Sequence, residues 1–200
     1  MDEESAADEM PEGLSRSPEL MDRNDTALLV VDVQQKLVNL IPQRPRILWN
    51  IRRLLNAADV LGLPHAVTEQ NPKKLGPTAS ELAELVGTPL AKMAFSCGEC
   101  GRRFSDWREA GIYRVLICGI ETHVCIQQTA LDLSASGFQV YLAVDAVGAR
   151  HEVDHETALR RMEMAGVVLV STEAAMFEWC RISGTPEFRK ISALAKETMP

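Results

Sequence analysis

The fold is decided by the stretch Val115-Leu-Ile-Cys-Gly-Ile-Glu-Thr-His-Val-Cys-Ile-Gln-Gln-Thr-Ala-Leu-Asp-Leu133. Residues 115–118 are apolar and mostly branched, which is typical of a strand that is buried on both faces. Gly119 ends this run, and from Cys125 onward the apolar residues recur at helical spacing. The stretch therefore predicts a strand, a tight turn in which Thr122 is the helix N-cap, and a helix whose first turn carries Cys125.

The position of Cys125 in the first turn of a helix has a chemical consequence. The first backbone N–H groups of a helix lack intrahelical acceptors, and the helix dipole is positive there. We therefore expect the pKa of the thiol to be lowered, which would make the thiolate available as a nucleophile. The same N–H groups could hold the oxyanion of a tetrahedral intermediate. The alternative is that Cys125 is a small buried apolar residue, the commoner role of a free cysteine.

Two charged residues lie where they could act together with this thiol. Asp32 follows Thr26-Ala-Leu-Leu-Val-Val31, a second run typical of a buried strand. Ligands of open α/β sheets bind just outside the carboxyl ends of the strands. Lys92 lies within a short, largely apolar segment, residues 89–96. A carboxylate, an ammonium group and a thiol brought together could serve as base, charge stabiliser and nucleophile.

Strand and helix patterns alternate along the chain. Pro45 predicts the start of a helix that ends at Gly62, because proline is tolerated in a first turn and glycine in a C-cap. Thr78 with Glu81 predicts a capping box for a helix through Val86. This alternation predicts an α/β fold, namely a three-layer α/β/α sandwich whose mostly parallel central sheet is covered by helices on both faces.

Further strands are predicted at residues 65–68, 138–144 and 167–170. Asp145 then falls at the carboxyl end of a strand, where it could line the pocket or cap the next turn. Thr172 is predicted to cap the helix that follows the last strand.

At this point the sequence resembles a known superfamily, the isochorismatase-like cysteine hydrolases, which include nicotinamidases and N-carbamoylsarcosine amidases. The matching segments are Val30-Val-Asp-Val-Gln34, Lys92, Gly119-Ile-Glu-Thr-His-Val-Cys125 and Val140-Tyr-Leu-Ala-Val-Asp-Ala146. The resemblance extends from about Asp25 to the end of the chain. Because the first three of these motifs are separated along the chain and occur in the right order, the resemblance is specific.

Within the superfamily, the chain is most similar to isochorismatase-domain proteins whose substrates are unassigned. This similarity rests on Thr68-Glu-Gln-Asn-Pro-Lys73 and on Phe95-Ser96 after Lys92. The nicotinamidase branch carries an Asp-x-His metal motif in the loop that here spans residues 69–77, and this chain has no such motif. We therefore expect no metal and no cofactor, and no nicotinamidase activity.

The resemblance implies roles for particular residues. The catalytic triad would be Asp32, Lys92 and Cys125, the backbone N–H groups of Glu121 and Cys125 would form the oxyanion hole, and the Ile120–Glu121 peptide bond would be cis. Side chains expected to line the pocket are Gln34, Glu69, Gln70, Phe95 and Thr122.

The expected reaction is hydrolysis of a small amide or related C–N substrate through a covalent thioester-type intermediate. Two alternatives stay open: an enol-ether hydrolase of the isochorismatase type, and a non-catalytic binding or assembly module on the same fold. A third interpretation, zinc binding or thiol redox chemistry at Cys97-Gly-Glu-Cys100, lacks a second ligand pair of the right spacing; His151 and His155 are a weak substitute. The alternative for the two cysteines is that they are incidental thiols near the site.

Composition limits the remaining possibilities. The chain has 200 residues, a hydrophobic content of 46% and a formal net charge of −7. Residues 1–20 carry seven acids against Arg16, so residues 21–200 are close to neutral. Without a clustered basic face or an apolar run of membrane length we expect no nucleic-acid or membrane partner. Five cysteines with no secretion signal favour a cytoplasmic protein that acts on a small molecule.

The same composition suggests the domain organisation. Residues 1–22 are acidic and poor in large apolar groups, which predicts a disordered or loosely docked arm, and residues 23–200 are expected to form one hydrolase domain. The resemblance implies a homo-oligomer, either a dimer, a tetramer or a larger assembly. Candidate interface residues near the C-terminus, which could equally be core, are Met176, Trp179, Phe188 and Ile191.

Overall fold

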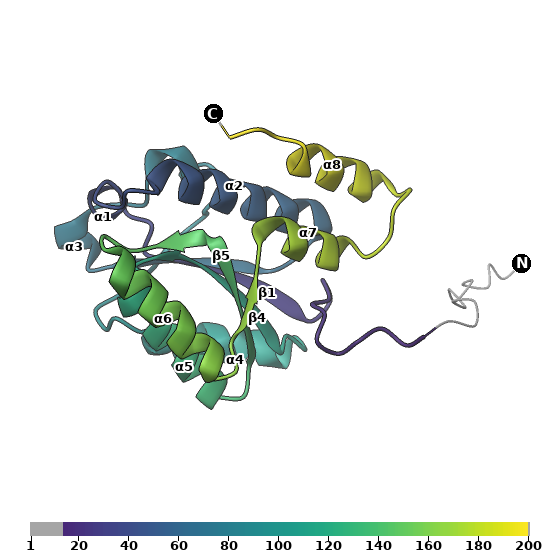
Figure 1. The fold of residues 1–200 in the computed structure, drawn as a ribbon. Helices are drawn as coiled ribbons and strands as arrows, with labels where there is room; N and C mark the ends of the chain where they lie inside the picture. The colour runs from purple at the N-terminus through teal and green to yellow at the C-terminus, as the bar shows by residue number, and fades with distance from the viewer. Residues whose placement is uncertain (1–13, 200) are drawn as a thin grey trace, which may run out of the picture.

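Six short runs of mostly buried residues form the central sheet of the computed structural model, which describes residues 14–199 (Figure 1). Every neighbouring pair of strands is parallel, and the spatial order is β3-β2-β1-β4-β5-β6. The strands are β1 (Thr26–Val31), β2 (His65–Gln70), β3 (Leu90–Lys92), β4 (Arg114–Ile120), β5 (Gln139–Gly148) and β6 (Val168–Val170).

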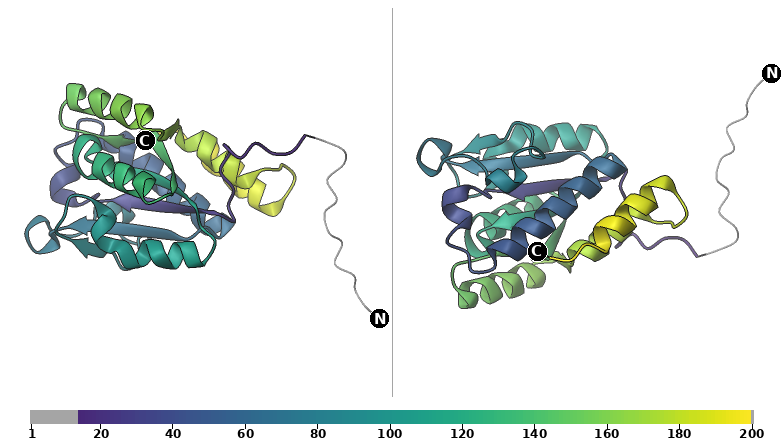
Figure 2. Two further views of the ribbon diagram at one scale, coloured as in Figure 1. Left: turned by 90° about the horizontal axis from the view of Figure 1, so that it is seen from below. Right: turned by 90° about the horizontal axis from the view of Figure 1, so that it is seen from above.

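Helices cover both faces of this sheet, as the views from below and from above show (Figure 2). The helices of one face are α2 (Arg44–Leu61), α7 (Thr172–Cys180) and α8 (Pro186–Ala195), and those of the other face are α4 (Gly101–Glu109), α5 (Gln127–Ala135) and α6 (Glu152–Met164). Each layer packs on its own hydrophobic core, because side chains alternate between the two faces along a strand. The predicted three-layer α/β/α sandwich is therefore confirmed.

The carboxyl ends of β1 and β4 lie side by side at the centre of the sheet. Val31 pairs with Gly119 in the parallel register, and the order of connection reverses between these two strands. Such a reversal opens a crevice for ligands in doubly wound sheets. The short elements gathered around this edge are α1 (Gln35–Val38), α3 (Pro72–Leu75), η1 (Ser80–Leu82), η2 (Cys97–Cys100) and the π-helical turn η3 (Thr122–Ile126).

Residues 14–22 of the predicted arm contact the folded body. Met21 is fully buried, and its N–H donates to the Glu178 carboxylate on α7. Arg16 donates to the carbonyl oxygens of Met21 and Glu178. The prediction of a disordered or loosely docked arm therefore does not hold for Met21, while residues 1–13 of that prediction lie outside the described residues.

Three local predictions about capping are wrong. Thr122 is the first residue of η3 and does not cap it; Glu121 precedes the turn, and no side-chain cap is formed there. Thr78 does not cap a helix through Val86, because only the 3₁₀ turn η1 forms and the Thr78 hydroxyl donates to Glu69 instead. The N-cap of α7 is Ser171, so Thr172 is its first helical residue.

Asp145 and the C-terminal apolar residues also differ from expectation. β5 continues to Gly148, so Asp145 lies within the strand, and its carboxylate accepts hydrogen bonds from the N–H and hydroxyl of Thr172. The three candidate interface residues that are fully buried core are Met176, Trp179 and Ile191, and Phe188 packs against the same core. None of the helices within residues 14–199 has the length and hydrophobicity needed to cross a bilayer.

Candidate active site

Asp32 lies directly after β1, at the centre of the carboxyl edge. Its side chain is fully buried, and its backbone has a φ of +53°, a left-handed conformation that few residues other than glycine adopt. The backbone N–H of Asp32 donates to the carbonyl oxygen of Thr68 on β2. The strained turn thus directs a carboxylate into the protein, and such strain is typical of functional positions.

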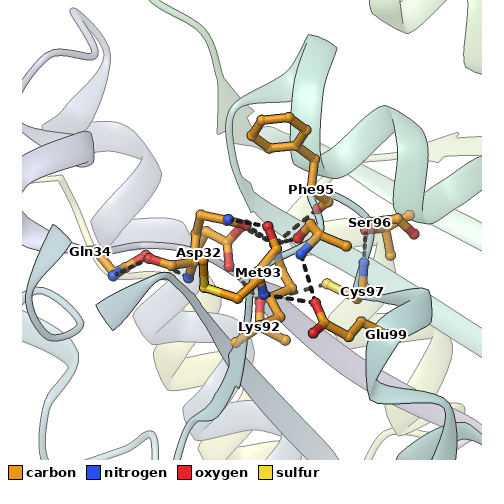
Figure 3. Close-up of polar contacts among 12 residues, drawn as sticks. Asp32, Gln34, Lys92, Met93, Phe95, Ser96, Cys97 and Glu99 are labelled. Atoms are coloured by element: carbon orange, nitrogen blue, oxygen red, sulfur yellow. Dashed lines mark hydrogen bonds and ion pairs between the residues drawn. The ribbon is translucent and has the colours of Figure 1, made fainter. Parts of the chain in front are cut away.

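Lys92 ends the edge strand β3 and meets Asp32 inside the protein (Figure 3). Its Nζ lies 2.6 Å from Oδ2 of Asp32, and both side chains are fully buried. The other acceptors around Nζ are Oε1 of Gln70 at 2.8 Å and the carbonyl oxygens of Ala94 and Phe95 at 3.1 and 2.9 Å. A buried ion pair persists only when further hydrogen bonds satisfy its atoms, and these acceptors supply them.

Cys125 lies in η3, directly after β4, and is almost completely buried. Burial raises the pKa of its thiol well above the ordinary value, the negative charge of nearby Asp32 adds to the rise, and the positive charge of Lys92 opposes it. The prediction of a lowered pKa is therefore wrong, because burial and the adjacent carboxylate outweigh the helix dipole.

Thr68 and Cys97 lie close to Asp32, and neither was predicted to act with Asp32 in the site. The Thr68 hydroxyl donates to Oδ1 of Asp32 at 2.8 Å, and Sγ of Cys97 lies 3.6 Å from the same hydroxyl oxygen. Burial raises the pKa of Cys97 to about 11. The signal for Thr68 was present, since it lies near the carboxyl end of a predicted strand.

The loop after Lys92 is held in place by Glu99. The Glu99 carboxylate accepts hydrogen bonds from the backbone N–H groups of Met93 and Ala94 at 2.7 and 2.6 Å, and these bonds lower its pKa (Figure 3). Because Ala94 and Phe95 present their carbonyl oxygens to Lys92, Glu99 fixes two of the acceptors that surround the ammonium group.

Three of the predicted pocket residues hold the framework of the site. Gln34 is fully buried, and its amide bonds both backbone groups of Gln70 and the carbonyl oxygen of Gly76. Gln70 accepts from Lys92 and donates to the carbonyl oxygen of Met93. Glu69 accepts from the N–H and hydroxyl of Thr78. The hydrogen bonds of Gln34 and Glu69 therefore join β1, β2 and the loop after β2.

The other two predicted pocket residues, Phe95 and Thr122, differ in burial and in their partners. The Phe95 side chain is 54% exposed, and its carbonyl oxygen faces Lys92. Thr122 is fully buried, and its hydroxyl lies 2.9 Å from Nδ1 of His155 on α6. The Ile120–Glu121 peptide bond is cis, and the Glu121 carboxylate accepts from the Arg150 guanidinium.

The Cys-x-x-Cys segment forms the short turn η2. Cys97 is buried and Cys100 is partly buried, and both are free thiols. In the part of the chain that the structure describes, no group of three or more His, Cys, Asp or Glu side chains is arranged to hold a metal ion. The site thus contains a carboxylate and an ammonium group in direct contact, with a thiol near enough for both charges to act on its pKa, and these are groups that nucleophilic catalysis with a positioned base requires.

A family comparison gives this arrangement its context. The model of the isochorismatase domain matches residues 26–174, which include Asp32, Lys92 and Cys125. The chain belongs to the isochorismatase family. Membership in this family supports a hydrolase-type function.

Relatives of this isochorismatase-family chain are similar over most of their length. Mouse isochorismatase domain-containing protein 2A is 38% identical over 173 residues, covering 86% of this chain and 84% of the relative. The solved structure of MAR1 ribonuclease from Caenorhabditis elegans has a TM-score of 0.84 and 36% identity, covering 90% and 94% of the two chains. The structure of YcaC from Pseudomonas aeruginosa with hexane-2,5-diol and covalent acrylamide has a TM-score of 0.76 and 25% identity, covering 90% and 96%.

Proposed function

We propose that this protein is a cysteine hydrolase that cleaves a small amide or a related C–N bond, with Cys125 as nucleophile, Asp32 as general base and Lys92 as charge stabiliser. The observation that carries the proposal is the buried ion pair of Asp32 and Lys92, in which Oδ2 and Nζ lie 2.6 Å apart and whose charges act on the nearby Cys125 thiol. No charged group needs to be buried in this way for the stability of the fold, because a buried ion pair contributes little or nothing to it.

The raised pKa of Cys125 indicates how the first step would proceed. The thiol keeps its proton in the free enzyme, so Asp32 accepts this proton as the sulfur attacks the carbonyl carbon. The carbonyl oxygen becomes an oxyanion, for which the backbone N–H groups of Glu121 and Cys125 are the proposed donors. Asp32 then gives the proton to the leaving nitrogen, the C–N bond breaks, and an acyl thioester remains on Cys125.

Water completes the cycle. Asp32, again ionised, takes a proton from a water molecule that attacks the thioester carbon, the C–S bond breaks, and the sulfur of Cys125 regains a proton as the carboxylic acid leaves. Lys92 stays protonated throughout and offsets the charge of Asp32 whenever the carboxylate is ionised. Thr68 keeps Oδ1 of Asp32 in place and leaves the other carboxylate oxygen to Lys92.

The covalent acrylamide in the Pseudomonas aeruginosa relative adds support, since acrylamide is an electrophile that nucleophilic groups capture, and it is itself a small amide. We therefore expect acrylamide to modify Cys125 in this protein. Replacement of Cys125 should abolish that modification.

The test is a screen of small primary amides and carbamoyl compounds, read as ammonia release. Cys125→Ala should lower the kcat/KM of any substrate found by about 10³-fold or more, whereas Cys180→Ala, the same change at a buried cysteine on α7, should leave it unchanged. Acid quenching during turnover should trap the acyl group on the peptide that contains Cys125. Full turnover by Cys125→Ala would contradict the proposal.

The same variants separate the enol-ether alternative. Hydrolysis of an enol ether needs protonation of the vinyl carbon and no thiol, so activity that survives Cys125→Ala but not Asp32→Asn would identify that reaction. If no substrate is turned over and Cys125 is inert to acrylamide, the non-catalytic module is favoured.

RNA cleavage is a second candidate because the Caenorhabditis elegans neighbour is described as a ribonuclease. The near-neutral charge of residues 21–200 disfavours it, since nucleic-acid binding needs clustered basic side chains. Incubation with a labelled RNA oligonucleotide in the presence and absence of a chelator tests it directly. RNA cleavage by the wild-type protein that is lost in Asp32→Asn would establish ribonuclease activity.

A further inference from the structure

The two cysteines of the turn η2 have no part in the proposed mechanism, yet one of them touches the site. Cys97 is the first residue of this 3₁₀ helix, and Cys100 is the last. Cys97 is fully buried, Cys100 is partly buried, and both thiols are free. A Cys-x-x-Cys pair is a common form of a dithiol that exchanges reversibly with a disulfide.

The form of η2 puts the two thiols on the same side of the turn. In a 3₁₀ helix the side chains at positions i and i+3 are eclipsed, and a rise of about 2.0 Å per residue separates their Cα atoms by about 6 Å. A disulfide needs Cα atoms roughly 4.4–6.8 Å apart. In agreement, Cys100 packs against the same hydrophobic core to which Cys97 belongs. The backbone of η2 therefore already has the spacing that a disulfide between Cys97 and Cys100 requires.

Cys97 is joined to the carboxylate of Asp32 through one hydroxyl group. Sγ of Cys97 lies 3.6 Å from Oγ1 of Thr68, and that oxygen lies 2.8 Å from Oδ1 of Asp32. The Thr68 hydroxyl has a single hydrogen, which it donates to the carboxylate. In the contact between Cys97 and Thr68 the thiol is therefore the donor, and its S–H group orients the hydroxyl toward Asp32.

Other bonds keep the backbone of η2 in place. The backbone N–H of Cys97 donates to the hydroxyl of Thr129 on α5 at 2.9 Å. Glu99, which lies between the two cysteines, accepts from the backbone N–H groups of Met93 and Ala94 (Figure 3). A disulfide within η2 therefore acts on the site through the side chain of Cys97, without a movement of the backbone.

We propose that Cys97 and Cys100 are a redox-sensitive modification site, at which a disulfide forms reversibly and slows the proposed hydrolysis. The disulfide itself does not depend on the proposed function, whereas its effect on catalysis rests on that function. When the disulfide forms, Cys97 loses the S–H group that donates to Thr68, so the carboxylate of Asp32 is held less firmly. Reduction restores the thiol and its hydrogen bond.

The reaction needs an oxidant, and a small-molecule disulfide such as glutathione disulfide supplies it. Cys100 is the more accessible thiol, so its thiolate attacks one sulfur of glutathione disulfide, the S–S bond breaks, and one glutathione leaves as a thiolate. Cys97 then gives up its proton and attacks the sulfur of Cys100, which releases the second glutathione. The two cysteines lose two protons and two electrons, and glutathione disulfide gains both. Because burial raises the pKa of both thiols, the exchange is slow.

The first test maps the disulfide and needs no substrate. The protein is incubated in mildly alkaline glutathione buffers of increasing oxidised fraction until its composition is constant. It is then quenched with acid, unfolded and labelled with N-ethylmaleimide. Trypsin cleaves after Lys92 and Arg102, so both cysteines lie in the peptide of residues 93–102, whereas Cys125 lies in the peptide of residues 115–150. Mass spectrometry therefore distinguishes a disulfide within η2 from one that involves Cys125.

We expect the peptide of residues 93–102 to carry an internal disulfide in the oxidised protein, while the other three cysteines stay free. Cys100→Ser should abolish this disulfide. The matched control is Cys180→Ala, which removes a buried thiol from α7 and should leave the disulfide unchanged. No internal disulfide even in glutathione disulfide alone, or one that joins residues 93–102 to residues 115–150, would overturn the inference.

The second test measures the effect on the site. With a substrate from the amide screen, the oxidised wild type should have a kcat about 5- to 10-fold below that of the reduced protein, with KM within about 2-fold. Dithiothreitol should restore kcat, and Cys100→Ser should have the same kcat in both buffers. Thr68→Val lacks the hydroxyl through which Cys97 acts, so its kcat should be low and should change by less than about 2-fold on oxidation.

The rate at which acrylamide modifies Cys125 is a second measure of the same effect and needs no substrate. This rate should also fall about 5-fold when the disulfide forms. If neither kcat nor this rate changes, the disulfide does not control the site and the inference fails. If the disulfide forms and slows acrylamide but no amide is hydrolysed, the inference holds and the proposed amide chemistry fails. If amides are hydrolysed through Cys125 and no disulfide forms, the proposed function holds and the inference fails.

Discussion

The two ends of the sheet use polar groups in opposite ways. At the amino end, residues 14–22 are held by groups that stay partly in contact with water: the Tyr141 hydroxyl donates to the carbonyl oxygen of Glu19 at 2.8 Å, and Asp22 forms a partly exposed ion pair with Arg181. At the carboxyl end, Asp32 and Lys92 form an ion pair that is wholly removed from water. Bonds of the first kind secure the chain at little cost, whereas the second kind costs several kcal/mol of desolvation per ion. The carboxyl end thus carries a desolvation cost that the stability of the fold does not require.

The largest difference between the two ends is expected when one methyl group is added at each end by a Gly→Ala substitution. Gly119 at the carboxyl end has a φ of +119°, and a Cβ there would lie 2.1 Å from the carbonyl oxygen of Val31, so β1 and β4 would have to separate. Gly119→Ala should cost more than about 4 kcal/mol of the free energy of unfolding. Gly166→Ala before β6 has a φ of +91° and no atom within 4 Å, so it should cost only about 1–2 kcal/mol.

Urea denaturation followed by far-UV circular dichroism measures both glycine variants. If the two variants differed by less than about 1 kcal/mol, the close approach of β1 and β4 would not be the constraint we infer.

The next largest effect is expected when one partner of the buried ion pair is removed. Lys92→Met leaves the Asp32 carboxylate buried without a cation, which should lower the free energy of unfolding by about 3–5 kcal/mol. Adding Asp32→Asn removes the remaining charge, so the double variant should regain most of that stability. Both variants should lack hydrolase activity. A double variant no more stable than Lys92→Met alone would show that the pair is not the source of the cost.

The smallest effect is expected at the amino end, where a substitution should lower the stability of the fold and leave the activity unchanged. Met21→Ala empties a fully buried position and should cost about 2–4 kcal/mol, while kcat of the folded enzyme stays within about 2-fold of the wild type. Leu14→Ala is the matched control, because Leu14 is completely exposed; it should change stability by less than about 0.5 kcal/mol. Denaturation midpoints measure the change in stability, and initial rates on the same samples measure the change in kcat. Loss of kcat in Met21→Ala would mean that the two ends are coupled.

Sequence patterns predicted the layers well because burial on both faces leaves a strong signal. The runs that became β1 and β4 consist almost entirely of buried residues. The edge strand β3 has only three residues, one of them exposed, so its pattern was too short to read as a strand. The capping predictions at Thr78 and Thr122 failed because these hydroxyls have tertiary partners, Glu69 and His155, that a local pattern cannot reveal.

The members of the proposed triad, Asp32, Lys92 and Cys125, could be named from motifs and strand ends. The structure pairs Asp32 with Lys92 and places the Cys125 thiol where both charges act on its pKa. The direction of the Cys125 pKa shift could not be predicted from the sequence, because it depends on how deeply the thiol is buried and on how close the charge of Asp32 lies. The role of Thr68 likewise depends on β2 lying beside β1.

The contacts of Met21 with α7 also bear on where this protein can be shortened. The family match ends at residue 174 and begins at residue 26, so it omits both Met21 and the Glu178 carboxylate that receives its N–H. It also omits Trp179 and Ile191, which are fully buried. The evolutionary unit that sequence comparison recognises is therefore smaller than the cooperative folding unit. A chain trimmed to the recognised residues would lose one wall of its core while keeping every member of the triad.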